Sequence, residues 1–128
     1  MQILAPISVG ELLDKISILE VKAERLDDDA KRDNVLRELA LLRETRDAAG
    51  VLTAEIAALA EELRAVNAGL WDVEDGKRDC ERRQDFGSDF IALARRVYRE
   101  NDRRAALKKA INLAAGSAIV EEKSYRAY

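Results

Sequence analysis

Histidine is absent from the chain of 128 residues, and cysteine, proline, tryptophan and methionine occur only once each. The lack of histidine excludes a Ser–His–Asp triad, a His-ligated metal and imidazole acid–base catalysis. The single cysteine, Cys80, has no partner for an internal disulfide, which predicts a reducing, cytoplasmic location. No run approaches the roughly 18 apolar residues of a membrane span, and no basic segment followed by an apolar run opens the chain. We therefore expect neither a membrane helix nor a signal peptide.

Charged residues, by contrast, are abundant at 37% of the chain, beside 48% hydrophobic and 5% aromatic residues. This composition excludes a disordered chain and supplies enough apolar side chains for one core of ordinary size. With six glycines, one proline and no long alternating run, it predicts an all-α fold: an antiparallel helical bundle or long helical hairpins with coiled-coil-like seams. We expect a single helical domain over residues 1–128, with an apolar lead over 1–7, helices over 8–115 and a docked tail over 116–128.

The first half of the chain contains the clearest helix signals. A helix is expected to begin after Ser8, because Ser8 and Glu11 have the spacing of a reciprocal capping box. A second helix is expected over residues 30–49, with Gly50 at its C-terminal end. The next apolar seam has regular spacings of four and three residues and predicts a third helix: Leu52, Ile56, Leu59, Leu63, Val66 and Leu70.

A fourth helix is expected after Gly87, with Ser88 or Asp89 as its N-cap. The neighbours Asn101 and Asp102 predict an interruption, because Asn is a preferred N-cap and the apolar phase changes at this point. The tail from residue 118 onward is too apolar to remain in solvent. We expect it to dock on the bundle or on a second subunit.

Opposite charges gather in different parts of the chain, although the overall net charge is only −3. Residues 1–76 carry a net charge of −8, whereas residues 77–109 carry +5. This distribution predicts attraction across the bundle between the acidic early helices and the basic later helix.

The most unusual polar stretch begins at Asn67, where five side chains share one face of a helix. Two interpretations are open for this stripe. It forms a polar pocket for a small molecule or divalent cation, or it is a helix flank on which Trp71 packs and Glu74 pairs with Arg78. The sequence favours the flank. The stripe consists of Asn67, Trp71, Glu74, Asp75 and Arg78.

A second polar segment is basic and supplies the remaining candidate ligand-binding residues, Tyr98, Asn101, Asp102, Arg104 and Lys108. In one interpretation Arg78, Arg95 and Arg104 clamp an anion, and Glu74 or Asp75 accepts a proton or binds Mg²⁺. In the other, the segment is a solvated helix face. The overall negative charge and the few aromatic residues argue against nucleic acid.

Several spaced motifs run through almost the whole chain. They are Ser8-Val9-Gly10-Glu11-Leu12-x-Asp14-Lys15-Ile16, Asn67-x-x-Leu70-Trp71-x-x-Glu74-Asp75-x-x-Arg78, Asn101-Asp102-x-Arg104-Ala105, Lys108-x-x-Ile111-Asn112 and Gly116-Ser117-x-x-Val120-Glu121-Glu122-Lys123-Ser124-Tyr125. Together they resemble a family of small uncharacterised bacterial proteins, a domain of unknown function. The resemblance implies a shared single-domain fold and no particular activity. Gly76 and Cys80 lie outside its pattern.

The motif residues fit either of two arrangements. In the first, they satisfy one another in a polar network that fixes the register of the helices and holds the tail. In the second, they form a pocket between the Trp71 stripe and the segment from Tyr98 to Lys108. The sequence identifies no catalytic residue and no metal site.

Two functions remain in competition. The first is a non-enzymatic helical interaction or scaffold protein that forms a homodimer and has a possible protein partner. It requires no cofactor. The alternative is a small all-α enzyme or binding protein for an anionic phosphate or carboxylate metabolite, assisted by Mg²⁺.

Overall fold

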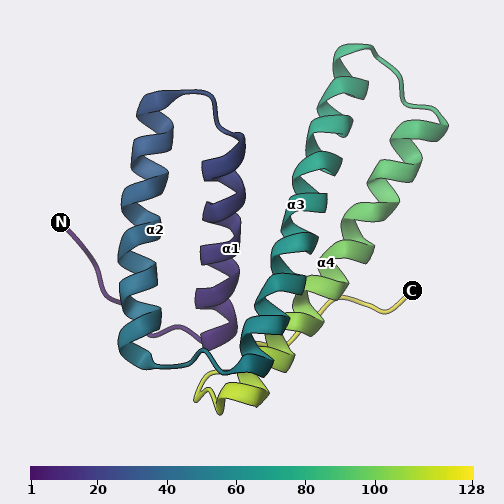
Figure 1. The fold of residues 1–128 in the computed structure, drawn as a ribbon. Coiled ribbons are helices and arrows are strands. Elements are labelled where there is room, and N and C mark those ends of the chain that lie inside the picture. Colours follow the sequence, from purple (N-terminus) through teal and green to yellow (C-terminus); the bar gives the residue numbers. More distant parts are fainter.

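The computed structural model describes residues 1–128 and contains four α-helices and no strand, so the predicted all-α fold is confirmed. The helices are α1 (Val9–Arg25), α2 (Asp29–Ala49), α3 (Ala54–Arg82) and α4 (Ser88–Ala115). They form two antiparallel hairpins that lie side by side, α1 with α2 and α3 with α4 (Figure 1). No helix is long and apolar enough to cross a membrane.

The predicted ends of the first two helices are largely correct. The Ser8 side chain accepts a hydrogen bond from the Glu11 amide at 3.0 Å, as in a capping box. The Glu11 carboxylate does not reach back to Ser8, however, because it binds the Lys108 ammonium at 2.5 Å instead. Asp28 caps α2, and Gly50 ends it in the left-handed conformation at φ 63°, which glycine adopts without strain.

Two expectations for α4 are wrong. Its N-cap is Gly87, without a side-chain hydrogen bond, and Ser88 is already helical. The helix also continues without interruption through Asn101 and Asp102. The Asp102 carboxylate does not cap a new helix because it pairs with Lys123 of the tail, and the exposed Asn101 lies within the helical run.

Helix α1 is the centre of the molecule, since it packs against all three other helices, whereas α2 packs against α1 alone. The core is correspondingly small and consists of Leu12, Leu13, Ile16, Leu19, Leu39, Ile56, Leu63 and Ile111. Of the predicted third seam, Ile56, Leu63 and Val66 are buried. Leu52 precedes α3 and is 45% exposed, so its assignment to the seam is wrong.

Beyond the ion pair between Arg25 and Asp72, the α3–α4 hairpin rises away from α1 (Figure 1). In α3, Val73 and Cys80 are buried along this stretch. A Cβ atom added to Gly76 would lie 3.0 Å from a methyl group of Leu93, so the glycine lets α4 approach closely. Gly76 and Cys80, which lie outside the motifs, are therefore packing positions.

The tail docks on the bundle, which is the first of its two expected docking places. Lys109 of α4 binds the Glu122 carboxylate at 3.0 Å, and Lys123 pairs with Asp102. The rings of Tyr98 and Tyr128 meet edge to face with centroids 5.1 Å apart. The tail thus runs back along the outer face of α4.

Candidate functional site

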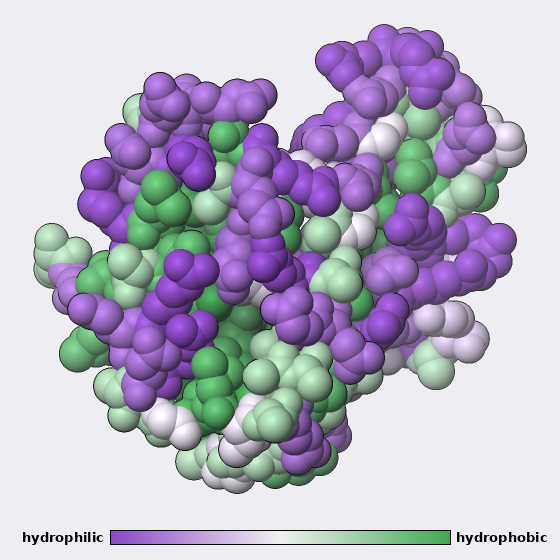
Figure 2. Space-filling model, in the orientation of Figure 1, coloured by the Kyte–Doolittle hydropathy of each residue, from purple (hydrophilic) through white to green (hydrophobic).

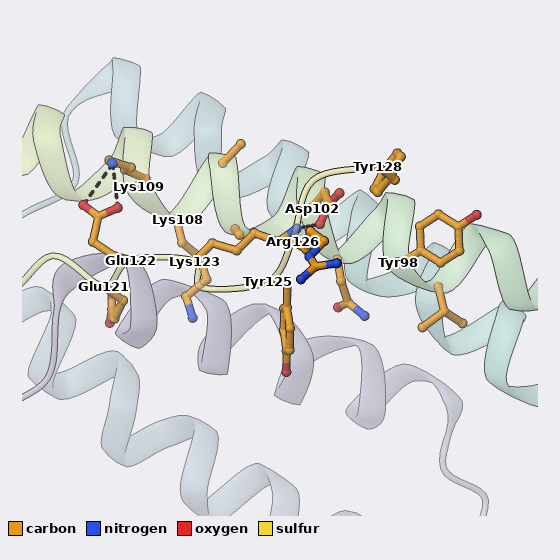
Figure 3. A pocket seen from close by; sticks show the side chains of 14 residues that line it. Tyr98, Asp102, Lys108, Lys109, Glu121, Glu122, Lys123, Tyr125, Arg126 and Tyr128 are labelled. Atoms are coloured by element: carbon orange, nitrogen blue, oxygen red, sulfur yellow. Dashed lines mark hydrogen bonds and ion pairs between the residues drawn. The ribbon is translucent and has the colours of Figure 1, made fainter.

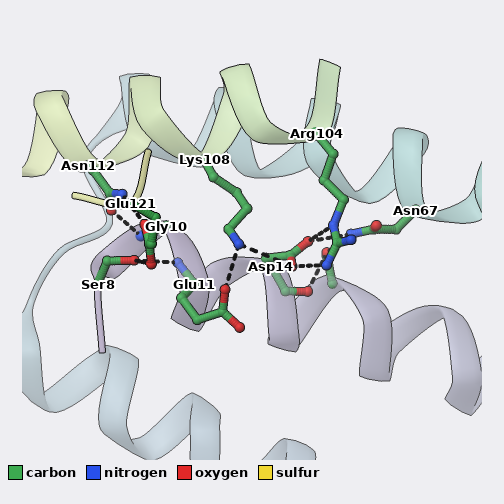
Figure 4. A network of polar contacts seen from close by, with 10 residues as sticks. Ser8, Gly10, Glu11, Asp14, Asn67, Arg104, Lys108, Asn112 and Glu121 are labelled. Atoms are coloured by element: carbon green, nitrogen blue, oxygen red, sulfur yellow. Dashed lines mark hydrogen bonds and ion pairs between the residues drawn. The ribbon is translucent and has the colours of Figure 1, made fainter. Parts of the chain in front are cut away.

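A buried carboxylate, Asp14, lies where α1, α3 and α4 meet (Figure 4). It accepts two hydrogen bonds from Arg104, from Nε at 2.9 Å and from Nη2 at 2.5 Å. It accepts a third from the Asn67 amide nitrogen at 2.9 Å. Such a two-pronged guanidinium–carboxylate contact fixes both distance and orientation, so Asp14 sets the register of α4 on α1.

Neighbouring side chains complete the surroundings of Asp14. Asn67 also donates to the Ser17 hydroxyl at 2.7 Å, and Ser17 donates to the backbone carbonyl of Asp14 at 2.8 Å. The Lys108 ammonium lies 3.9 Å from the Asp14 carboxylate and binds Glu11 more closely. Two α1 carboxylates thus face two α4 cations, which is part of the predicted attraction across the bundle.

A second set of contacts joins the start of α1 to the end of α4 and the tail. The Gly10 amide donates to the Asn112 side-chain oxygen at 2.6 Å, and the Asn112 amide nitrogen donates to Glu121 at 2.9 Å. The Ser8 hydroxyl also donates to Glu121. A Cβ atom on Gly10 would lie 2.5 Å from the Lys108 carbonyl oxygen, so only glycine permits this approach of two backbones.

The network changes the acidity of two groups. Hydrogen bonds to Asp14 raise the pKa of Arg104 against the opposing effect of burial, and the charges of Asp14 and Glu11 add to the rise. Desolvation raises the pKa of Glu121, but hydrogen bonds from Ser8, its own backbone and Asn112, with the charge of Lys108, lower the pKa overall. Both shifts stabilise the charged forms.

No buried side-chain nitrogen or oxygen lacks a hydrogen-bond partner. The groups around Asp14 therefore satisfy one another, as the first of the two arrangements requires. Sequence reasoning picked out Asn67, Arg104 and Lys108 as candidates and left out Asp14, on which two of them converge. A signal was present, because one face of α1 carries small or polar residues at spacings of four and three: Gly10, Asp14 and Ser17.

The Trp71 stripe borders an open hollow of about 420 Å³. All five predicted stripe residues line it, together with Arg104 and the apolar Ile18, Val21 and Leu70. The predicted pair is present as well, since Glu74 lies 3.9 Å from Arg78, and Lys77 binds Glu74 at 3.0 Å. We call this space the Trp71 hollow.

The other predicted residues lie elsewhere. Tyr98, Asn101, Asp102 and Lys108 line a groove of about 730 Å³ between α4 and the tail (Figure 3). Of the second segment, only Arg104 reaches the Trp71 hollow. The second of the two arrangements, one pocket between the two segments, is therefore not formed, because α4 turns one face toward α1 and α3 and another toward the tail.

The proposed anion clamp is not assembled either. Arg104 is committed to Asp14, Arg78 is exposed beside Glu74, and Arg95 is exposed and borders neither space. No group of three or more metal-ligating side chains is present.

Comparison with known proteins gives a family but no activity. No curated protein and no solved structure matches the chain. One family model matches residues 3–128, which include the lead from Ile3 onward and the whole tail. The chain belongs to the family of unknown function DUF6165.

Proposed function

We propose that the protein is a non-enzymatic helical interaction protein that acts as a homodimer. The observation that carries this proposal is the solvent-accessible surface of the protein, which measures 8607 Å² for a chain of 14.3 kDa. A compact monomer of this mass exposes about 6,800 Å². The excess is larger than the roughly 800 Å² that each partner buries in a typical stable complex.

Apolar side chains contribute to this excess surface at the end of the molecule where the α2–α3 connection meets the end of α4 (Figure 1). We call this the closed end. The space-filling view shows hydrophobic residues gathered at this end (Figure 2). Leu52, Leu113 and Ile119 are between 39% and 66% exposed there. An exposed apolar end of this kind is typical of an interface, and a second copy is the partner that the excess area supports.

The lead supports the same proposal. Ile3 and Leu4 are exposed by 80% or more, and the segment extends away from the helices beside α2 (Figure 1). Because the family model includes these residues from position 3 onward, the apolar lead belongs to the shared domain. In a dimer, the second copy would remove the exposed side chains of the lead from water.

The network around Asp14, in which every buried polar side-chain atom has a partner, favours a structural role over the alternative enzyme. Arg104, one of the three guanidinium groups of the anion clamp, is already neutralised by the buried carboxylate of Asp14. Such a network holds three helices in one register, which is what an interaction surface needs. Thermal-shift measurements with phosphorylated metabolites and Mg²⁺ test the alternative, and a raised melting temperature would favour it.

Sedimentation equilibrium from micromolar to millimolar concentration tests the homodimer. We expect twice the chain mass for the native protein and the single-chain mass for Leu113→Glu. Ile91→Glu is the matched control, because Ile91 is 53% exposed near the start of α4, at the opposite end of that helix from Leu113, and the control is expected to remain dimeric. A native protein that stays monomeric throughout would overturn the proposal. If both variants remain dimeric, the closed end is not the interface.

A further inference from the structure

The Trp71 hollow has rigid walls, since every residue that lines it belongs to a helix. Ile18 and Val21 of α1 and Leu70 and Trp71 of α3 supply its apolar surface. Its volume of about 420 Å³ lies within the range of small-molecule sites, roughly 300–1,000 Å³. An indole beside aliphatic side chains suits a planar ring.

Arg104 and Asn67 belong to the network and also border the hollow. Each has one hydrogen-bonding atom without a partner in the protein. Arg104 uses Nε and Nη2 on Asp14, and Nη1 makes no hydrogen bond within the protein. Asn67 directs its nitrogen to Asp14 and Ser17, and its oxygen points away from Asp14 (Figure 4). The assignment of nitrogen is chemically required, because a carboxylate only accepts hydrogen bonds.

These two atoms each keep some contact with solvent. No buried side-chain nitrogen or oxygen lacks a partner, so an atom without one is accessible from outside. Because Arg104 and Asn67 both line the hollow, a free donor and a free acceptor lie at its border, on side chains that Asp14 holds in place. Side chains fixed in this way lose little entropy when a ligand binds.

The charged side chains that line the hollow are of both signs. Glu74 and Asp75 carry two negative charges, and Arg78 and Arg104 carry two positive ones. Asp14, which pairs with Arg104, adds a third negative charge. The hollow therefore has no excess of positive charge with which to attract an anion.

We propose that the Trp71 hollow binds a neutral planar ligand with an adjacent acceptor and donor, a cyclic amide of the kind found in pyrimidine bases. Its carbonyl oxygen accepts from Arg104 Nη1, its ring N–H donates to the Asn67 oxygen, and its ring packs on Trp71. This site does not depend on dimer formation, and its test is independent of the test for the dimer.

Trp71 is the only tryptophan in the chain, so its fluorescence reports directly on the hollow. We expect uridine to shift or quench the emission in a saturable titration. The matched ligand N3-methyluridine lacks the donor and should bind at least tenfold more weakly, because the Asn67 oxygen would lose its partner. Equal binding of the two ligands, or no change in emission with uridine at millimolar concentration, would overturn the proposal.

Two further measurements separate specific binding from other causes of quenching. Ile18→Phe narrows the hollow without touching the network and should abolish the response to uridine, whereas Ile91→Phe, at an exposed position of α4, should preserve it. Circular dichroism shows whether both variants remain helical. Benzoate is a planar ligand with a carboxylate in place of the neutral amide group of uridine. Tighter binding of benzoate than of uridine would contradict selection for a neutral ligand.

Discussion

The α3–α4 hairpin has two regions with different neighbours. In the three-helix region, residues 54–72 and 98–115, the hairpin packs against α1 and shares the network around Asp14. In the two-helix region, residues 73–97, the hairpin rises beyond α1, and Val73 and Cys80 are its buried residues (Figure 1). One pair of continuous helices thus passes from a region held by polar and apolar contacts to one held by a narrow apolar seam.

The comparison shows what a third helix makes possible. A buried carboxylate needs several donors, and Asp14 obtains them from α3 and α4 together. Two helices alone leave every polar side chain beside water, so charged residues of the two-helix region pair at the surface. Arg82 with Asp79 is one such pair, at three residues' spacing. Register in the two-helix region depends on close packing, such as Leu93 over Gly76.

The largest expected effect comes from removing Asp14. Asp14→Ala leaves Arg104 and Asn67 without their partner at a buried site and should lower the free energy of unfolding by about 3 kcal/mol, or abolish folding. Urea denaturation measures the loss. The matched control is Asp75→Ala, an exposed carboxylate on α3, with an expected change below about 0.5 kcal/mol. Equal losses in the two variants would remove the distinction between buried network and surface charge.

Each region contains a glycine in a close helix contact, and the two glycines differ in the atoms that an added methyl group would meet. Gly10→Ala places a Cβ atom 2.5 Å from a backbone oxygen of α4, so the helices must separate, at a cost of about 2 kcal/mol. Gly76→Ala meets only the flexible end of Leu93 at 3.0 Å, and the better helix propensity of alanine offsets the contact. We expect a change within about 0.5 kcal/mol for Gly76→Ala. Denaturation curves in which Gly76→Ala costs more than Gly10→Ala would contradict the comparison.

Much of the fold was predictable, because helices and their seams depend on local spacing. The ends at Ser8 and Gly50 follow from the conformations that serine and glycine adopt there. The interruption at Asn101 was wrongly predicted, since Asp102 binds the tail, 21 residues further along the chain. The preference of a residue for the N-cap position has little effect where a tertiary contact binds its side chain.

The candidate site was only half predictable for a related reason. Helical spacing placed Asn67, Trp71 and Arg78 on one face, and the Trp71 hollow confirms that they share it. Spacing within one helix carries no information on which face another helix covers. Asp14 and Arg104 are 90 residues apart, and nothing local to either indicates their pairing.

Hydrogen exchange sharpens the comparison without any substitution. Amides of the two-helix region should exchange at least about tenfold faster than those in the three-helix parts of α3 and α4, because opening the end of a hairpin exposes little buried surface. Mass spectrometry of peptides covering residues 73–97 and 100–115 measures the two rates in the same molecule. Uniform protection along both helices would show that the two-helix region is covered in solution, as a second copy would cover it.

The smallest expected effect concerns the tail, which Glu121 ties to the three-helix region. Its pKa is lowered from the ordinary 4.5, so ionised Glu121 stabilises the docked tail above pH 4.5, and this contribution is lost as the pH falls through the lowered value. An NMR titration of the Glu121 carboxyl carbon should therefore give a midpoint below 4.5. Ser8→Ala removes one hydrogen bond to the carboxylate and should raise the midpoint, whereas Ser88→Ala, at the start of α4 and remote from the tail contact, should not move it. An unchanged midpoint in Ser8→Ala would show that the hydrogen bond from Ser8 does not hold the tail carboxylate.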